Sequence, residues 1–262
     1  MMKLSPLGVT VLIGLLLVGC ASTPQQEIRG GMDRISPVRA AEVNTRLGLG
    51  YFERGQLQRA MENFQTALRH DPEHVPAHLA LALIFETIGN DDGARQHYRR
   101  AVRLAPNDGA TLNAYAVFQC RSGDFAGAER LFMRAVADPF YSTPEVAFAN
   151  AGACARRKND LELAERHLRS ALDLDPVFPD ALYHLAEVSL DQDQPLRARG
   201  FFQRLESVVD SQADATILLL GYRIETRLNN QEQAAVYARR LSNNFPDSAE
   251  ARELMRSLDN YD

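Results

Sequence analysis

The sequence predicts an all-α chain of stacked helix–turn–helix units. A small residue recurs at intervals of 34 to 36 positions, and a large residue follows four positions after each of the first five copies. Prolines close five of the units, because a proline disfavours a helical conformation at the residue before it. The small residues are Ala60, Ala94, Ala128, Ala164, Ala198 and Ala234, the large ones Phe64, Tyr98, Phe132, Leu168 and Phe202, and the prolines Pro72, Pro106, Pro139, Pro176 and Pro246. Since each unit packs only on its neighbours, such an array accommodates 262 residues without one large core.

Residues 1–19 have the pattern of an export signal. Lys3 follows two methionines, and Leu7 to Val18 is an apolar run too short and too rich in glycine for a comfortable membrane span. The small residues ahead of Cys20 resemble the lipobox of bacterial lipoproteins, in which the cysteine becomes the acylated first residue of the mature chain. The alternative is an ordinary signal peptide with an accidental cysteine. Two or three acyl chains anchor a protein stably, because each buried methylene contributes about 0.8 kcal/mol.

Residues 20–40 are expected to form a flexible linker. The stretch from Ala21 to about Val38 is polar, contains Pro24, Pro37 and a pair of glycines, and shows no period of 2 or 3.6. A coil of this length spans roughly 25 Å. By analogy with the enterobacterial sorting rule, Ala21 rather than aspartate after the cysteine favours the outer membrane. We therefore expect a body tethered to the periplasmic face of that membrane.

The first unit, residues 41–74, is the cleanest copy. Leu47, Gly48 and Tyr51 share one face of its first helix, and a turn at residues 53–56 leads into the second helix. Ala60, Phe64, Ala67 and Leu68 share one face of that second helix, which ends at Asp71-Pro72.

Five further copies and a closing helix complete the chain. The six repeats are expected at residues 41–74, 75–108, 109–142, 145–178, 179–212 and 214–247. The two steps of 36 residues indicate two-residue insertions near Asp138–Pro144 and Ser207–Asp214. A last helix at 248–259 carries the apolar stripe Ala251, Leu254, Met255 and Leu258, and Asp247 with Glu250 predicts its capping box. This helix would cover the open end of the stack.

Two cysteines remain once Cys20 is assigned to lipid attachment. An exported chain folds in an oxidising compartment, where two such thiols usually pair. We predict a disulfide between Cys120 and Cys154 that contributes about 3 kcal/mol. The alternative is a pair of buried free thiols.

The sequence offers no site for metal, nucleic acid or catalysis. The net charge is −5, and the only basic block longer than two residues is at 156–158, so the clustered footprint that nucleic acid requires is missing. His70, His74 and His78 recur every four residues, but prolines interrupt the run, which predicts a loop rather than a metal site. His97 and His167 occupy the same repeat position and are expected to be exposed. No catalytic signature or phosphate loop is present, so we expect neither an enzyme nor a cofactor or small-molecule substrate.

The period of 34 and the pattern of small and large residues resemble the tetratricopeptide repeat. This resemblance implies a right-handed superhelix in which the first helix of each repeat lines a groove. The groove positions implied are Thr45, Leu49, Phe52, Leu79, Leu83, Glu86, Asn113, Val117, Arg121, Ala149, Ala153 and Arg156. Its amino-terminal end is apolar and suits an apolar helix or an extended segment, whereas arginines give the middle positive charge. The alternative is that the apolar residues only pack between helices or are covered by the linker.

Three stretches narrow the resemblance further. They are Leu47–Tyr51 with the turn at Gly55, the segment Asp138–Tyr141 followed by Phe148–Gly152, and Leu218–Arg223. Together with the lipobox and the linker, they resemble the type IV pilus biogenesis lipoproteins of the PilF/PilW type, the pilotin or pilus-stability family. That resemblance implies a lipoprotein that helps the secretin subunit reach the outer membrane and multimerise. The same architecture also fits a scaffold of β-barrel assembly or of peptidoglycan hydrolases.

Overall fold

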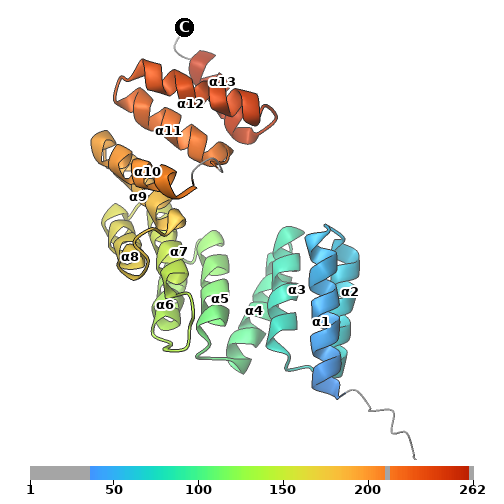
Figure 1. The fold of residues 1–262 in the computed structure, drawn as a ribbon. Coiled ribbons are helices and arrows are strands. Elements are labelled where there is room, and N and C mark those ends of the chain that lie inside the picture. The colour runs from blue at the N-terminus through green and yellow to red at the C-terminus, as the bar shows by residue number, and fades with distance from the viewer. Residues whose placement is uncertain (1–35, 210–212, 260–262) are drawn as a thin grey trace, which may run out of the picture. The chain divides into compact units, whose positions relative to one another are not determined.

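The computed structural model describes residues 36–209 and 213–259, which contain thirteen α-helices and no strand (Figure 1). The predicted all-α repeat architecture is confirmed. The export signal, Cys20 and most of the expected linker lie outside the described residues. The helices are α1 Pro37–Glu53, α2 Leu57–His70, α3 Val75–Thr87, α4 Asp91–Leu104, α5 Gly109–Arg121, α6 Phe125–Val136, α7 Pro144–Arg157, α8 Leu161–Leu174, α9 Pro179–Asp191, α10 Pro195–Val209, α11 Ala215–Arg227, α12 Gln231–Asn244 and α13 Ala249–Asp259.

Consecutive helices pair as six hairpins, α1 with α2 through α11 with α12, and α13 packs on the last pair. The turn inside each hairpin contains one residue with a positive φ. In the first three hairpins this residue is Gly55, Gly89 or Gly123, and in the last three it is Asn159, Asp193 or Asn229. Glycine takes this backbone conformation without a steric penalty, and asparagine and aspartate tolerate it better than other residues. The turn geometry is therefore the same along the chain although its sequence changes.

The recurring alanines are the points where the helices of a hairpin cross. All six of them are buried, and the large side chains four positions later fill the space beside them. Gly48 shows how tight the crossing is, since a Cβ atom there would lie 2.5 Å from the ring of Phe64. In the sixth hairpin, Tyr237 is buried and packs edge-on against Phe202. This ring occupies the space that the sequence pattern leaves open at Ala238.

One expected boundary and one expected helix cap are wrong. The sequence predicts a linker up to residue 40, but α1 begins at Pro37, because the Ser36 hydroxyl accepts a hydrogen bond from the backbone N–H of Arg39 at 3.2 Å. The last helix is capped by Ser248, whose hydroxyl accepts from the backbone N–H of Ala251 at 3.0 Å, rather than by the expected box of Asp247 and Glu250. None of the helices within residues 36–209 and 213–259 is both long and apolar enough to span a membrane.

Candidate functional site

The odd-numbered helices line one face of the array. Direct packing joins α1 to α3, α5 to α7, α7 to α9, α9 to α11 and α11 to α13, whereas within 36–209 and 213–259 no two even-numbered helices pack to the same extent. The first helix of each hairpin therefore lies on the inner side of the stack, as the sequence resemblance implied, and we call this surface the inner face.

The amino-terminal part of the inner face carries two exposed leucines. Leu49 on α1 is 46% exposed and Leu83 on α3 is 42% exposed. Phe52 and Leu79 beside them are half-buried and pack partly against the core clusters of the first four hairpins. The expected apolar strip thus consists of two side chains free to meet a partner and two that share their surface with the core.

Thr45 was expected on the groove, but it is not accessible. Its side chain is buried, and its hydroxyl oxygen has no hydrogen-bond partner. One turn before it, Ala41 packs with Ala67 and Ala77 in the contact between the first two hairpins, and Thr45 continues that buried face. Ala149 on α7 is buried for the same kind of reason, in the cluster that joins the fourth and fifth hairpins.

Next to Leu83 the surface becomes polar. A hollow of about 220 Å³ is lined in part by Leu83, Glu86, Phe118 and Arg121. Glu86 forms an ion pair with Arg121 and accepts a hydrogen bond of 2.5 Å from the hydroxyl of Tyr98. Burial raises the pKa of that Tyr98 hydroxyl to about 12, so it stays a donor at all ordinary pH values. Asn113, also expected here, accepts a hydrogen bond of 3.2 Å from Asn150 of α7.

Carboxylates compensate the arginine in the middle of the inner face. Arg156 donates to Asp191 at 2.5 Å and to the buried carboxylate of Glu187 at 2.7 Å. Burial alone would raise the pKa of Glu187, but the hydrogen bond with His184 and the charge of Arg156 outweigh it, and the pKa is lowered. The positive groove centre that the sequence suggested is therefore largely neutralised. A spacing of one repeat between opposite charges, as in Glu86 and Arg121, is the sequence signal for such pairs.

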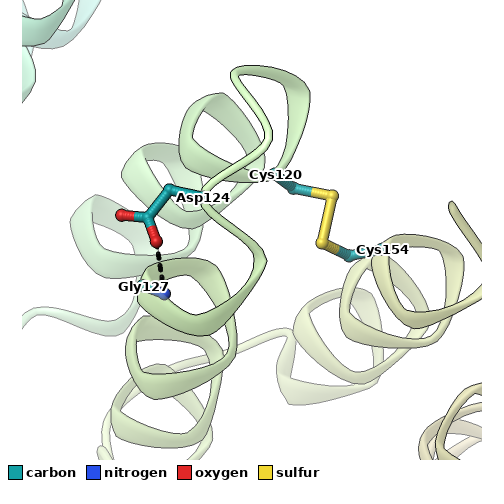
Figure 2. Close-up of a disulfide and its surroundings, with 4 residues drawn as sticks. All are labelled: Cys120, Asp124, Gly127 and Cys154. Carbon is teal, nitrogen blue, oxygen red and sulfur yellow. Dashed lines mark hydrogen bonds between the residues drawn. A yellow bond between two sulfur atoms is a disulfide. The ribbon is translucent and has the colours of Figure 1, made fainter. Parts of the chain in front are cut away.

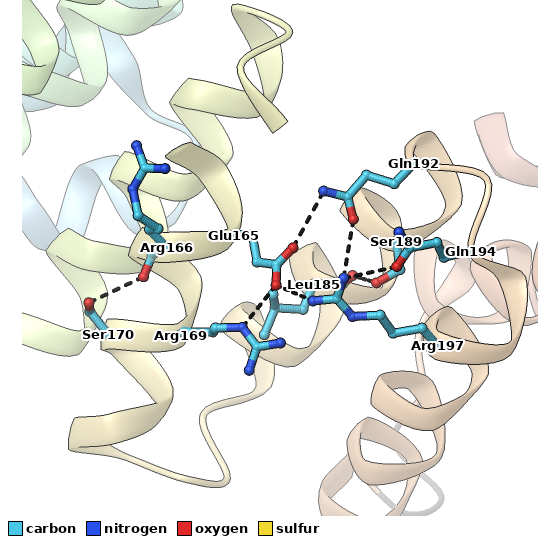
Figure 3. A network of polar contacts seen from close by, with 9 residues as sticks. All are labelled: Glu165, Arg166, Arg169, Ser170, Leu185, Ser189, Gln192, Gln194 and Arg197. Carbon is cyan, nitrogen blue, oxygen red and sulfur yellow. Dashed lines mark hydrogen bonds and ion pairs between the residues drawn. The ribbon is translucent and has the colours of Figure 1, made fainter. Parts of the chain in front are cut away.

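Two further links hold neighbouring repeats without facing a partner. A disulfide joins Cys120 of α5 to Cys154 of α7, as the sequence predicts, with 5.8 Å between the Cα atoms (Figure 2). In the network of Figure 3, Glu165 of α8 forms an ion pair with Arg197 of α10 and accepts from Arg169 at 2.9 Å. The hydrogen bond from Arg197 is the main cause that lowers the pKa of Glu165 to about 2.

The histidines serve packing. His78 is buried, its Nε2 lies 3.1 Å from the carbonyl oxygen of Pro72, and its Nδ1 lies 3.0 Å from Nδ1 of His97. Burial and then the neighbouring His78 lower the pKa of His97 to about 4. The expectation that His167 is exposed is wrong, because its ring is buried between hairpins with Nε2 3.0 Å from Glu129. Among the described residues no three His, Cys, Asp or Glu side chains come together as a metal site would require.

Comparison with known proteins places this fold among tetratricopeptide-repeat proteins. The family model of the tetratricopeptide repeat matches residues 45–109 and 155–215. The type IV pilus assembly protein PilF of Pseudomonas aeruginosa is 26% identical over 245 residues, which cover 92% of this chain and 94% of that protein. The crystal structure of PilW, a widely conserved type IV pilus biogenesis factor, superposes with a TM-score of 0.75 and 31% identity, covering 82% of this chain and 98% of PilW. The structure of P. aeruginosa PilF gives a TM-score of 0.70 with 25% identity, covering 84% and 99% of the two chains.

Proposed function

Because the chain belongs to the tetratricopeptide-repeat family of type IV pilus biogenesis proteins that includes PilW and PilF, we propose that it is a pilotin of a type IV pilus system. It is an outer-membrane lipoprotein, anchored on the periplasmic face through acylated Cys20. Its repeats hold a secretin subunit, the unit of the pore through which the pilus emerges, and bring that subunit to the membrane where it multimerises. The role needs no catalysis, because it requires only that the repeats bind the secretin subunit and that the acyl chains attach the protein to the outer membrane.

The exposed Leu49 and Leu83 carry this proposal. Most leucines of the described repeats are buried or half-buried, whereas these two stand on the inner face with nearly half of their surface open. Burying one leucine side chain against a partner contributes about 1.5–3 kcal/mol, so the pair can supply a large share of a micromolar affinity. Phe52 and Leu79 extend the contact with their exposed edges. An apolar helix or strand of the secretin subunit fits such a strip.

The test replaces each exposed leucine by a charged residue. Leu49→Glu and Leu83→Glu bury a carboxylate without a partner in the complex, and we expect secretin multimers in the outer membrane to fall at least tenfold. Leu47→Glu is the matched control. Leu47 lies on the same helix and is 52% exposed, but it is two residues from Leu49 and so points about 200° away around the helix.

Three measurements separate the possible outcomes. Circular dichroism melts establish that all variants are folded. Normal multimers in both inner-face variants refute the docking surface. Co-purification of a different client, such as a β-barrel assembly factor or a peptidoglycan hydrolase, refutes the pilotin role and leaves the binding strip in place.

The anchor has its own test. Mass spectrometry of the protein extracted from outer membranes is expected to show an acylated Cys20 as the first residue. Cys20→Ser removes the acyl acceptor, so we expect the variant to leave the outer-membrane fraction and the secretin to mislocalise. A Cys20→Ser protein that stays in the outer membrane contradicts the anchor.

A further inference from the structure

One phenylalanine stands almost entirely in solvent. Phe140, in the connection between α6 and α7, is 93% exposed, although its neighbour Tyr141 is half-buried against Gly109. The groove proposed above does not use it, since it lies on a connection between hairpins rather than on an odd-numbered helix. A solvent-exposed aromatic side chain of this size is a candidate contact.

The exposure of Phe140 is built into the turn. The carboxylate of Asp138 accepts from the backbone N–H of Phe140 at 2.9 Å and from that of Gly109, on α5, at 2.9 Å. The N–H of Tyr141 donates to the Asp138 carbonyl at 3.2 Å. A Cβ atom at Gly109 would lie 2.6 Å from Tyr141, so the tyrosine is seated tightly on the start of α5. The loop therefore holds its phenylalanine outward in a fixed position.

The same turn recurs between other hairpins, and its third position is exposed each time. In Asp175-Pro176-Val177 the carboxylate accepts from the N–H of Val177 at 3.1 Å, and in Asp71-Pro72-Glu73 from that of Glu73 at 3.0 Å. The exposed third position is Glu73, Asn107, Phe140, Val177 and Asp247 in the five turns that contain a proline. It is polar in three turns and apolar in the two central ones, where the turn itself requires nothing apolar.

The first three of these turns lie on one edge of the array (Figure 1). In a stack of antiparallel hairpins, the connections between hairpins and the start of the first helix fall at the same ends of the helices. Figure 1 shows the start of α1 and the connections α2–α3, α4–α5 and α6–α7 along that edge. The exposed Val38 stands in the first turn of α1. The described chain therefore begins, with Ser36 and α1, at the edge that carries Phe140 (Figure 1).

Arginine side chains lie beside two of these turns. Arg134 donates to the carbonyl of Pro106 at 2.5 Å, and Arg204 donates to that of Pro176 at 2.8 Å. Both side chains are exposed, and these bonds hold each guanidinium group beside its turn. An exposed aromatic ring suits the interface of a membrane, where rings enter the boundary of the acyl chains.

We infer that this edge rests on the lipid surface, with Phe140 inserted at the interface. The inference rests on the lipid anchor proposed above. Fifteen residues separate Cys20 from Ser36, and a chain of that length reaches at most about 50 Å, so the edge at which α1 begins stays within that distance of the acyl chains. Burying one phenylalanine side chain shifts a population roughly 10- to 100-fold. That shift is too small to bind the membrane alone, but it is enough to orient a molecule that acyl chains already hold there.

This orientation has a consequence for the inner face. With the edge of the turns on the bilayer, the helices α1 to α7 stand upright on the membrane, and the part of the inner face that carries Leu49 and Leu83 opens sideways, along the lipid surface (Figure 1). A client subunit held on Leu49 and Leu83 is then presented next to the membrane that it must enter, rather than on the side facing away from it.

The chain contains no tryptophan, so a single introduced indole reports on one site. Acylated full-length protein carrying Phe140→Trp is reconstituted in vesicles of phosphatidylethanolamine and phosphatidylglycerol in a ratio of about three to one. We expect a blue-shifted emission and at least a twofold loss of fluorescence when the lipids are brominated near the headgroup end of the acyl chain. Lys158→Trp, in the turn between α7 and α8 at the opposite edge, is the control and is expected to show neither effect.

The outcomes distinguish this inference from the anchor. Acylated, vesicle-bound protein whose Phe140→Trp indole emits as in water, without quenching by brominated lipid, refutes the membrane contact and leaves the anchor in place. Equal quenching of the Lys158→Trp indole also refutes it, because the turn edge is then not the one that faces the lipid. A protein whose Cys20 carries no acyl chain refutes the anchor and this inference with it.

Discussion

Reduction of the disulfide between Cys120 and Cys154 is expected to destabilise the array by roughly 4 kcal/mol. The bond joins α5 to α7 and closes a loop whose ends are 34 positions apart. Constraining a loop of that length in the unfolded chain lowers its entropy by about 13 cal/mol/K, which corresponds to roughly 4 kcal/mol at 25 °C. The two cysteines are buried between the third and fourth hairpins, so the folded array keeps its packing when the bond is absent.

The assay is thermal and urea unfolding followed by circular dichroism, with and without a phosphine reductant. A destabilisation of this size is expected to lower the Tm by about 8–16 °C, because each kcal/mol shifts it by roughly 2–4 °C in a chain of 150–250 residues. The double variant Cys120→Ala/Cys154→Ala serves as control and is expected to unfold at the lower temperature in both buffers. The chain contains no tryptophan, so the near-ultraviolet circular dichroism of the tyrosines provides a second probe of the unfolding transition.

The reasoning fails if the fully reduced protein, verified by thiol titration, unfolds within about 1 kcal/mol of the oxidised protein. The entropic constraint would then be offset within the unfolded chain or by strain in the folded one. A reductant-dependent shift of similar size in the double variant also contradicts the prediction, because it would come from a source other than this bond.

Three other changes test the packing. Burial and His78 lower the pKa of His97 to about 4, so as the pH falls the unfolded chain binds this proton before the folded chain does. The free energy of unfolding is therefore expected to fall by up to about 3 kcal/mol between pH 6.5 and pH 4. Urea titrations at several pH values check this, and His97→Leu should make the free energy of unfolding depend less on pH. Arg199→Ala leaves the buried Glu225 without the arginine that donates to both of its carboxylate oxygens, so the free energy of unfolding should fall by about 3 kcal/mol. Adding Glu225→Gln to this variant removes the unpaired charge and should recover part of that loss. Gly152→Ala places a Cβ atom 2.5 Å from Leu168 and should cost about 1–3 kcal/mol in denaturant unfolding.

The repeat register could be predicted from the sequence because steric demands repeat with the fold. Each hairpin needs one small residue where its helices cross and one large residue beside it, so Ala60 and Phe64 have counterparts in nearly every copy. Where the sixth copy breaks the pattern, Tyr237 on the neighbouring position fills the space. A repeat period in the sequence reveals a residue type that nearly every copy needs at the same position. It does not reveal a side chain that fills the space from another position in a single copy.

The polar contacts could not be predicted in the same way. Arg121 and Arg156 stand as positive charges in the sequence, but Glu86 and Glu187 neutralise them from the adjacent repeat. Such a pair depends on the rotamers of two side chains that lie 31 to 35 positions apart. A single sequence shows the spacing but not the rotamers. His167 illustrates the same limit, because its burial follows from the contact with Glu129 of the preceding repeat.

These links also show why the first hairpin suits a partner. Among the described residues, the side-chain ion pairs and the disulfide that join helices of different hairpins all begin at the second hairpin, with Glu86 and Arg121. The first hairpin joins the second mainly through apolar contacts, such as the cluster of Phe64 with Leu81 and Ile84, and through polar contacts of the connection between α2 and α3. In a repeat array, stability is the sum of each unit and its interfaces, so the unit with the fewest directional links adjusts most easily. That unit presents Leu49, so the end of the array that offers an apolar surface is also the end best able to shift against Leu83 as a client is bound.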